Sequence, residues 1–373
     1  MSVFLTKIQV NKIFHLEDIL IEIDSQEKKH LILTGKNGSG KTSLLNSIAD
    51  FLQSMTTSVG WDYLTRLTEK DSAVILDFNT FDRLAKKIQN NDLLLSFYSA
   101  TRKTEVIIPQ TPEKPNLGPV IGIRHTKIGE FIKFLVDLKI QEALARNEHQ
   151  IEAANEIKNW FENFTSLLQQ IFEGDEIRLI FNYKDYSFTI EQGQRKFGFN
   201  ELSDGYSAII DIIADLIIKM QNQNSLTRAY EKEGIVLIDE VETHLHLKLQ
   251  RLILPMLTQI FPNIQFIVTT HSPFVLSSLD NAVAFDLERK MRLEDLTEYS
   301  YEALAEGYFN VETGSNFLMT KLERFEKLSQ IPQKDAAENA EYESLDQEFA
   351  SMDETLIPQN VKGQYSLIKL KAK

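Results

Sequence analysis

The segment from Gly35 to Thr42, GKNGSGKT, constrains the fold more than any other part of this 373-residue chain. The spacing of Gly35, Gly40, Lys41 and Thr42 matches the pattern G-x-x-x-x-G-K-[ST]. Apolar residues 30–33 precede it and predict a buried strand, and apolar residues at helical spacing follow it. In a strand, loop and helix of this kind, backbone N–H groups and the helix N-terminus face phosphate oxygens. The sequence therefore predicts an α/β fold with a phosphate-binding loop.

Seven residues of this segment are predicted to bind a nucleotide: Asn37, Gly38, Ser39, Gly40, Lys41, Thr42 and Ser43. Lys41 is expected to reach the β- and γ-phosphates, and Thr42 is expected to ligate Mg²⁺. The motif thus predicts both a nucleotide and a magnesium ion as cofactors.

Composition narrows the class of protein further. With 43% hydrophobic residues, the chain can form one large or two moderate domains. It has no cysteine, which excludes disulfides and thiolate metal sites and favours a cytoplasmic location. The N-terminus has no signal-peptide pattern, and the most apolar stretch, residues 208–218, is interrupted by Asp211 and Asp215. No membrane association is therefore expected.

The formal net charge of −14 argues against a broad electrostatic grip on nucleic acid, although a local site stays open. Two small basic clusters are read as solvated surface: Arg83, Lys86 and Lys87, and Lys362, Lys369, Lys371 and Lys373.

Periodicity divides the first half of the chain into four parts. Residues 2–23 predict two antiparallel strands, residues 52–93 look irregular and partly helical, and residues 93–109 predict strands. The proline-rich residues 109–119 are expected to form an exposed loop. Residues 126–172 then change to a helical pattern, which predicts an inserted helical lobe.

The second half returns to strands and buried helix. Residues 176–183 and 186–192 predict strands, and residues 207–220 predict a buried helix. Residues 234–240 and 264–270 predict buried parallel strands, joined by an amphipathic helix that Pro255 should kink.

After Phe285 the sequence again predicts a helical region. Two apolar stripes predict a helical hairpin: Leu318, Leu322, Phe325 and Leu328, and Leu345, Phe349, Met352 and Leu356.

Adjacent carboxylates follow the predicted strand 234–238 in "GIVLIDEVETHLH". Asp239 is expected beside the phosphate-binding loop, where it would hold Mg²⁺ through water. Glu240 is expected to orient and deprotonate the attacking water. A site that only binds nucleotide does not need the second carboxylate, so the pair predicts hydrolysis.

Two further segments complete the predicted site. "QFIVTTHSP" places His271 at a strand end, where its imidazole could contact the γ-phosphate. In "LSDGY", Ser203 and the backbone N–H of Gly205 lie just before the buried helix and predict an anion site at its N-terminus. One chain cannot easily bring two such sites to one nucleotide, whereas a head-to-tail pair of chains can.

These four segments, in this order, resemble the ATP-binding-cassette (ABC) ATPase superfamily. More narrowly, they resemble its RecF/SMC-like branch and the ATPase heads of the OLD family and related anti-phage ATPases such as PtuA and AriA. The matching segments are GKNGSGKT (35–42), LSDGY (202–206), LIDEVETHLH (237–246) and TTHSP (269–273).

The resemblance implies a P-loop ATPase head with a mixed sheet and antiparallel N-terminal strands. It also implies that two heads sandwich two ATP molecules, with Ser203 of each head closing over the Lys41 loop of the other. The expected organisation is an ATPase head split into residues 1–125 and 173–290, a helical insertion at 126–172 and a helical C-terminal region at 291–373, which would dock a partner.

The sequence departs from the patterns of related ATPases in ways that count against a transporter subunit and against a nuclease centre in the C-terminal region. Asp204, Gly205 and Tyr206 replace the Gly-Gly-Gln signature of transporter ATPases, and the glutamine-bearing coupling loop of that family is not assignable. Residues 291–373 contain no D-x-D pair and no histidine, so neither a Toprim nor an HNH nuclease centre is expected there.

Three smaller signals are given structural interpretations. Glu242, His244 and His246 are not expected to form a separate metal site, because histidines two apart face different ways on a helix. Arg102 is expected on the surface. Tyr206 is expected to pack near the segment LSDGY (202–206), which is called the signature segment below.

The sequence is thus interpreted as a cytoplasmic ABC-type ATPase that hydrolyses ATP as a homodimer or larger homo-oligomer. By resemblance, it would control a separate nuclease or toxin in bacterial anti-phage defence. The alternatives are a RecF-like DNA repair clamp, a transporter subunit, and a P-loop kinase or GTPase of another class.

Overall fold

The computed structural model describes residues 2–56, 72–101, 106–118, 122–174, 176–221, 232–294, 296–299, 301, 303–304, 316–352 and 359–371. The chain forms two compact units, unit 1 (residues 1–298) and unit 2 (residues 299–373). The boundaries predicted at residues 125, 172 and 290 stay predictions.

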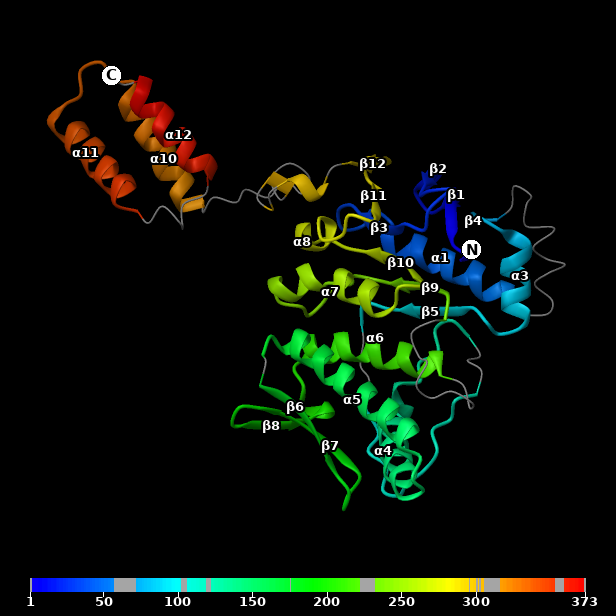
Figure 1. The fold of residues 1–373 in the computed structure, drawn as a ribbon. Coiled ribbons are helices and arrows are strands. Elements are labelled where there is room, and N and C mark those ends of the chain that lie inside the picture. The colour runs from blue at the N-terminus through cyan, green and yellow to red at the C-terminus, as the bar shows by residue number, and fades with distance from the viewer. Residues whose placement is uncertain are drawn as a thin grey trace. The chain divides into compact units, whose positions relative to one another are not determined.

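A six-stranded sheet, in the order β12-β11-β3-β10-β9-β5, forms the centre of unit 1 (Figure 1). Five strands are parallel, and β12 pairs antiparallel with β11 at the edge. The strands are β3 (His30–Thr34), β5 (Leu94–Tyr98), β9 (Gly234–Ile238), β10 (Ile264–Thr269), β11 (Ala282–Asp286) and β12 (Met291–Leu293). Their continuous apolar runs suit strands that are buried on both faces. The predicted parallel pairing of β9 with β10 is confirmed.

A second, antiparallel sheet has the order β2-β1-β4. Its strands are β1 (Leu5–Ile13), β2 (Leu16–Glu22) and β4 (Val74–Phe78). The two predicted N-terminal strands are therefore confirmed, whereas β4 was not predicted. Helix α3 (Phe81–Gln89) follows β4, and α1 (Lys41–Met55) follows the phosphate-binding loop. Apolar residues of both sheets and of α1 share one core.

The side chain of Gln265 joins the two sheets. It is fully buried in β10, its Oε1 accepts the N–H of Leu5 at 2.7 Å, and its Nε2 donates to the carbonyl of Leu5 at 2.9 Å. Nε2 also donates to the carbonyl of Lys29 at 2.8 Å. One amide therefore satisfies backbone groups of β1 and of the segment before β3.

The predicted helical insertion is confirmed as two long helices, preceded by the short 3₁₀ helix η1. The elements are η1 (Ile128–Glu130), α4 (Phe131–Asn147) and α5 (Ile151–Phe172). Trp160 of α5 stacks on Phe164 and contacts Phe134 of α4 edge to face, so aromatic packing holds the pair together. Of the loop predicted at 109–119, residues 109–118 form no helix or strand and are mostly exposed.

The chain then forms a third, antiparallel sheet and the buried helix α6. The elements are β6 (Ile177–Asn182), β7 (Ser187–Gln192), β8 (Arg195–Gly198), η2 (Phe199–Glu201) and α6 (Asp204–Met220). The first two strands were predicted and β8 was not. Helix α6 begins three residues earlier than predicted and lies between β5 and the α4–α5 pair (Figure 1).

Two helices separate the last strands of the main sheet: α7 (Leu247–Ile260) and α8 (Pro273–Leu276). Helix α7 runs as one element through Pro255. The helical pattern expected directly after Phe285 is wrong, because residues 291–293 form β12 and residues 296–298 form the 3₁₀ helix η3 (Leu296–Glu298).

Within residues 316–371, the described part of unit 2 forms three helices where a two-helix hairpin was predicted. They are α10 (Asn316–Ser329), α11 (Ala336–Ser351) and α12 (Gln359–Lys371). The first stripe and most of the second are confirmed as core, but Val361 and Ile368 of α12 complete it. Leu356 lies outside the described residues. Helix α12 was not predicted, since its residues were interpreted only as a lysine-rich tail.

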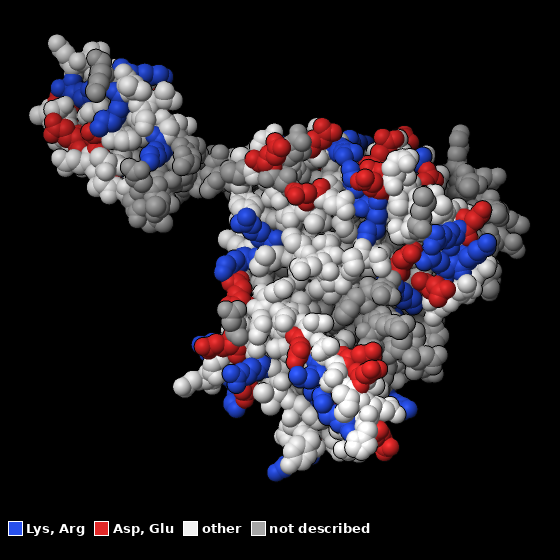
Figure 2. Space-filling model, in the orientation of Figure 1, with Lys and Arg blue, Asp and Glu red and all other residues white. Residues whose placement is uncertain are grey.

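Charges of both signs are mixed on the face of unit 1 that Figure 2 shows. On the face of unit 1 in Figure 2, the described Lys and Arg side chains alternate with Asp and Glu and form no continuous basic band. Lys87 of the predicted basic cluster pairs with Glu233 at 2.8 Å. In the part of the chain that the structure describes, no helix is long and apolar enough to cross a membrane.

Candidate active site

Three neighbouring parallel strands bring the predicted segments together. Strand β10 lies between β3 and β9, so the residues that follow these strands meet at one edge of the sheet. The chain continues this pairing past the strand ends: the N–H of Thr270 donates to Leu33 at 3.0 Å, and the N–H of Val241 donates to Thr269 at 3.1 Å. The segments after all three strands are therefore held in fixed register.

The phosphate-binding loop needs its glycines for backbone geometry. Gly35, Gly38 and Gly40 have φ angles of 135°, 82° and 92°, which residues with a side chain rarely adopt. A Cβ atom on Gly40 would also lie 2.7 Å from Leu16 Cδ1, at the start of β2. Helix α1 begins at the next residue, so its N-terminal N–H groups face the loop.

Lys41 is buried, with 5% of its surface exposed. Its Nζ donates to the carbonyls of Gly35 at 2.8 Å and Lys36 at 3.1 Å. Burial lowers the pKa of the Lys41 ammonium, and the nearby carboxylates of Glu240 and Asp239 oppose that shift. An ammonium held across the loop in this way can donate to phosphate oxygens.

Asp239 connects the loop to the strands. It is 3% exposed, and its Oδ1 accepts the hydroxyl of Thr42 at 3.1 Å and the hydroxyl of Thr269 at 2.6 Å. Thr42 and Asp239, the two predicted metal-binding residues, thus lie in direct contact. A hydroxyl and a carboxylate are oxygen ligands of the kind that Mg²⁺ prefers, so these residues fit that ion.

Glu240 has a constrained backbone, with a φ of 45°. Its N–H donates to Thr269 Oγ1 at 2.7 Å, and its carboxylate accepts the hydroxyl of Thr243 at 3.3 Å. A left-handed conformation in a residue with a side chain costs of order 1 kcal/mol and is common at functional sites. The strained turn therefore fixes the direction of the Glu240 backbone where the chain leaves the end of β9.

Thr269 links the two carboxylate residues, a role that the sequence interpretation missed. Its hydroxyl donates to Asp239 and accepts from the N–H of Glu240. The available signal was a polar residue at the end of an apolar strand, since Thr269 is fully buried and therefore needs hydrogen-bonding partners.

His271 follows β10 and is half-buried. Burial lowers the pKa of its imidazole, and the charge of Lys41 lowers it further. The imidazole is therefore neutral at pH 7 and can donate one hydrogen bond and accept another. The backbone N–H of His271 donates to Oε1 of Glu242, in the turn that follows β9.

Ser203 and Gly205 are not joined to the phosphate-binding loop. Ser203 is exposed at the N-terminus of α6, and its hydroxyl makes no capping hydrogen bond. Among the described residues, no hydrogen bond links Ser203 to residues 35–42. The chain therefore presents this helix N-terminus outward.

The signature segment packs instead on the turn after β9. A Cβ atom on Gly205 would lie 2.6 Å from the carbonyl oxygen of His244. The ring of Tyr206 lies 4.6 Å from that of Phe172 and 6.1 Å from that of His246. The expected packing of Tyr206 is confirmed, and Gly205 is required by the close approach of two backbones.

The sequence interpretation also missed the turn between β1 and β2. A Cβ atom on Gly40 would lie 3.5 Å from His15 Cε1, so His15 is next to the phosphate-binding loop. Its neighbour Phe14 is 80% exposed and has a φ of 52°. An exposed aromatic residue in a tight hairpin turn was the available signal.

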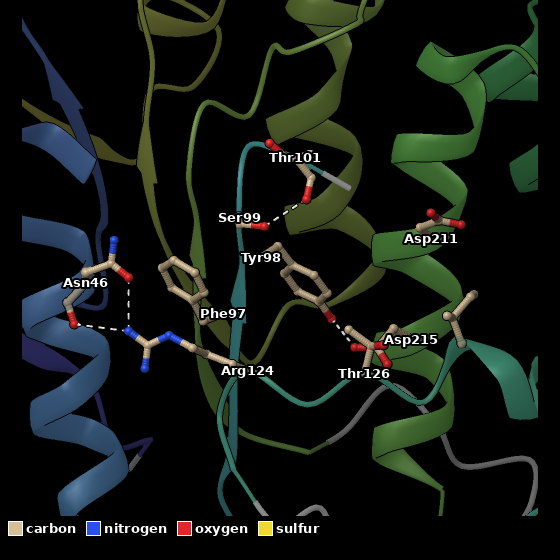
Figure 3. Close-up of a pocket in the computed structure, with 10 residues that line it drawn as sticks. Asn46, Phe97, Tyr98, Ser99, Thr101, Arg124, Thr126, Asp211 and Asp215 are labelled. Carbon is tan, nitrogen blue, oxygen red and sulfur yellow. Dashed lines mark hydrogen bonds between the residues drawn. The ribbon is translucent and has the colours of Figure 1, made fainter. Parts of the chain in front are cut away.

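A pocket of about 400 Å³ lies beside this site, between α1, β5 and α6 (Figure 3). On one side, Arg124 bonds to Asn46 Oδ1 at 3.0 Å and covers the ring of Phe97. On the other side, the hydroxyl of Tyr98 donates to Asp215 at 2.6 Å. The carbonyl of Tyr98 accepts the N–H of Asp239 at 2.8 Å, so the pocket adjoins the site.

No glutamine is among the described residues that line this pocket, so the coupling-loop glutamine stays unassigned. Arg102 lies outside the described residues.

The chain is similar to a protein family and to several known proteins. Residues 122–277 match the family described as "AAA domain, putative AbiEii toxin, Type IV TA system". The chain is 29% identical over 331 residues to the Septu protein PtuA of Bacillus mycoides (strain KBAB4), an alignment that covers 83% of this chain and 43% of that protein. It is 35% identical over 176 residues to the Retron Ec83 probable ATPase of Escherichia coli, covering 42% of this chain and 30% of that protein.

The predicted resemblance to PtuA and to related ATPases is confirmed. The chain spans less than half of the length of these curated relatives. A solved structure of an SMC head bound to the C-winged helix domain of ScpA is 13% identical to this chain, with a TM-score of 0.43. That alignment covers 80% of this chain and 100% of the SMC head.

Proposed function

We propose that this chain hydrolyses ATP at the edge formed by β3, β10 and β9. Its main support is that Asp239 accepts hydrogen bonds from Thr42 and Thr269. Because Thr269 also holds the N–H of Glu240, the residues for metal binding and for base catalysis form one connected unit.

Each residue has a distinct role in the proposed reaction. The loop N–H groups and Lys41 hold the phosphates, while Thr42 and Asp239 hold Mg²⁺. The ion would neutralise charge on the phosphate oxygens. Glu240 orients the attacking water and accepts its proton. The neutral imidazole of His271 donates to an oxygen of the γ-phosphate and so responds to its presence.

We also propose that two copies bind ATP head to tail. The exposed Ser203 hydroxyl and the first N–H groups of the 17-residue helix α6 would complete the partner's site. This arrangement assigns a nucleotide-binding role to the N-terminus of α6, where Ser203 makes no hydrogen bond to the described phosphate-binding loop of its own chain.

The output of the proposed ATPase is control of a separate effector. The relatives carry the names of Septu and retron proteins, which supports a nuclease or toxin partner in a bacterial defence module, acting in the cytoplasm. The helical insertion, residues 126–172, and the C-terminal region, residues 291–373, are the proposed docking surfaces.

Glu240→Gln provides the test. Removal of the base should trap ATP and the closed dimer, because all groups that bind nucleotide remain. We would purify tagged Glu240→Gln protein from its native host with Mg-ATP and measure native mass and co-purifying chains together. Lys41→Ala, handled identically, is the control that should bind no ATP.

A dimer that carries ATP and a nuclease-like or toxin-like chain supports the proposed function. ATP-dependent recovery of duplex DNA alone would favour the RecF-like clamp, and recovery of a membrane protein would favour a transporter subunit. Unchanged ATP turnover by Glu240→Gln would contradict the assignment of the base.

A further inference from the structure

Glu242 is a buried carboxyl group with no role in the reaction described above. It lies in the turn after β9, three residues beyond Asp239, and its Oε1 accepts the backbone N–H of His271. Its Oε2 is buried and has no hydrogen-bond partner in the described part of the chain. The side chain therefore spans from the β9 turn to the β10 turn.

The environment of Glu242 favours a neutral carboxylic acid. Burial raises the pKa of this carboxyl group, the N–H of His271 and the hydroxyl of Thr270 oppose that shift, and the charge of Glu240 adds to it. A buried oxygen without a partner is much less costly when the group is uncharged. The accepting oxygen, Oε1, can hold the His271 N–H in either protonation state.

We propose that Glu242 is a positioning residue that fixes the backbone of His271, and so aims its imidazole at the γ-phosphate. This role rests on the proposed ATP hydrolysis. This contact joins the turn that carries Glu240 to the backbone of His271 itself, so the base and the phosphate-contacting imidazole are held in one geometry.

The contact is suited to this task because, among the described residues, Oε1 of Glu242 is the acceptor of the His271 backbone N–H. The neighbouring N–H groups are anchored separately: that of Thr270 bonds to Leu33, and that of Ser272 bonds to the hydroxyl of Thr270. Loss of the Glu242 side chain would leave the partly buried His271 N–H without this acceptor, and the segment would shift to find another.

The experiment compares Glu242→Leu and Glu242→Gln. Leucine removes the acceptor but keeps the bulk, so kcat should fall about 100-fold while KM for ATP changes little, because the phosphate-binding loop is untouched. Glutamine keeps an oxygen at Oε1 and is uncharged, so it should recover most of kcat. Glu148→Leu, the same change at an exposed turn residue, is the matched control.

A second readout detects the contact without turnover. In protein labelled with [¹⁵N]histidine, the His271 amide signal is assigned by its loss in His271→Gln. Its resonance should move upfield in Glu242→Leu, because a hydrogen bond to a carboxyl oxygen is lost, and it should stay near its original position in Glu242→Gln.

The outcomes separate the inference from the function on which it rests. If wild-type protein hydrolyses no ATP, the proposed function is wrong, and the amide signal still reports whether Glu242 holds His271. If Glu242→Leu moves that signal yet turns over ATP at the wild-type rate, or if Glu242→Gln loses as much kcat as Glu242→Leu, the positioning role is overturned.

Discussion

The hydroxyl of Thr42 donates to Oδ1 of Asp239 at 3.1 Å, which joins the first turn of α1 to the end of β9. The two residues are 197 positions apart in the chain. Substitution of this carboxylate is therefore a direct test of the metal site. Asp239→Asn keeps the shape and the acceptor but removes the charge that Mg²⁺ requires.

We expect Asp239→Asn to lower Mg-dependent ATP turnover by about 100-fold or more, a loss typical of removing one group that stabilises the transition state. ATP affinity measured in EDTA should stay near the wild-type value. Calorimetric titration and steady-state kinetics check both expectations. A variant that keeps wild-type turnover in Mg²⁺ would refute the metal-binding role.

A mixture of two inactive variants tests whether the sites are shared between chains. Lys41→Ala should lose nucleotide affinity and Ser203→Arg should block the partner's site. In a head-to-tail heterodimer, one site then has both residues intact, so an equal mixture should recover about a quarter of wild-type turnover.

The control for this mixture puts both substitutions in one chain. When the doubly substituted chain is mixed with wild-type chain, every shared site in the heterodimer is defective, and turnover should fall below that of wild-type chain alone at the same concentration. No recovery from the two single variants, with no inhibition by the double variant, would show that each chain hydrolyses ATP by itself.

Gly205→Ala should disturb the signature segment without touching the phosphate-binding loop. The added methyl would lie 2.6 Å from the His244 carbonyl oxygen, so one backbone must shift. We expect a stability loss of about 1–3 kcal/mol and reduced ATP-dependent dimerisation, with ATP affinity of the monomer retained. Analytical ultracentrifugation with Mg-ATP measures the dimer.

Gly363→Ala is the matched control, because no atom lies within 4 Å of its added Cβ in α12. This substitution should be neutral or stabilise the helix by up to about 1 kcal/mol. Equal dimerisation of the Gly205 and Gly363 variants would contradict a role for the Gly205 contact.

The burial of His30 leads us to expect that the free energy of unfolding falls in acid. It is 4% exposed, and burial lowers the pKa of its imidazole from 6.5 to about 4. Its Nδ1 accepts the N–H of Phe266 at 3.0 Å, which requires the neutral ring. Because the folded pKa lies below the unfolded one, this contribution is present above pH 6.5 and is lost as pH falls toward 4, by about 3 kcal/mol.

His30→Asn should flatten that dependence, since the amide oxygen can accept the same N–H and does not titrate. Urea unfolding at pH 7.5, 5.5 and 4.5 gives the free energies, with His125→Asn as an exposed-site control. Equal pH slopes in wild type and His30→Asn would show that another group governs acid unfolding.

Local patterns explain why much of the site could be predicted. The glycines of the phosphate-binding loop, the apolar run before Asp239 and the residues of β10 each carry their signal in a few consecutive positions. The predicted catalytic and metal-binding residues Lys41, Thr42, Asp239, Glu240 and His271 all follow adjacent strands, although their roles stay predictions.

Other features depend on contacts that leave little trace in the sequence. Strand β4 is five residues long and is recognisable only through its pairing with β1. The approach of Gly205 to His244 and the bond from His271 to Glu242 connect separate segments of the chain. Side-chain identity alone specifies none of these partners, and tertiary packing decides them.

The position of β3 in the main sheet also sets the order in which the site can be assembled during synthesis. Its two neighbours, β10 and β11, come from residues 264–286, far beyond the loop that β3 supports. The hydrogen bonds between the Gln265 side chain and the Leu5 backbone likewise cannot form until β10 has been synthesised, so the N-terminal sheet also waits for this part of the chain. In a nascent chain, β3 therefore cannot pair on both of its edges until β11 has left the ribosome.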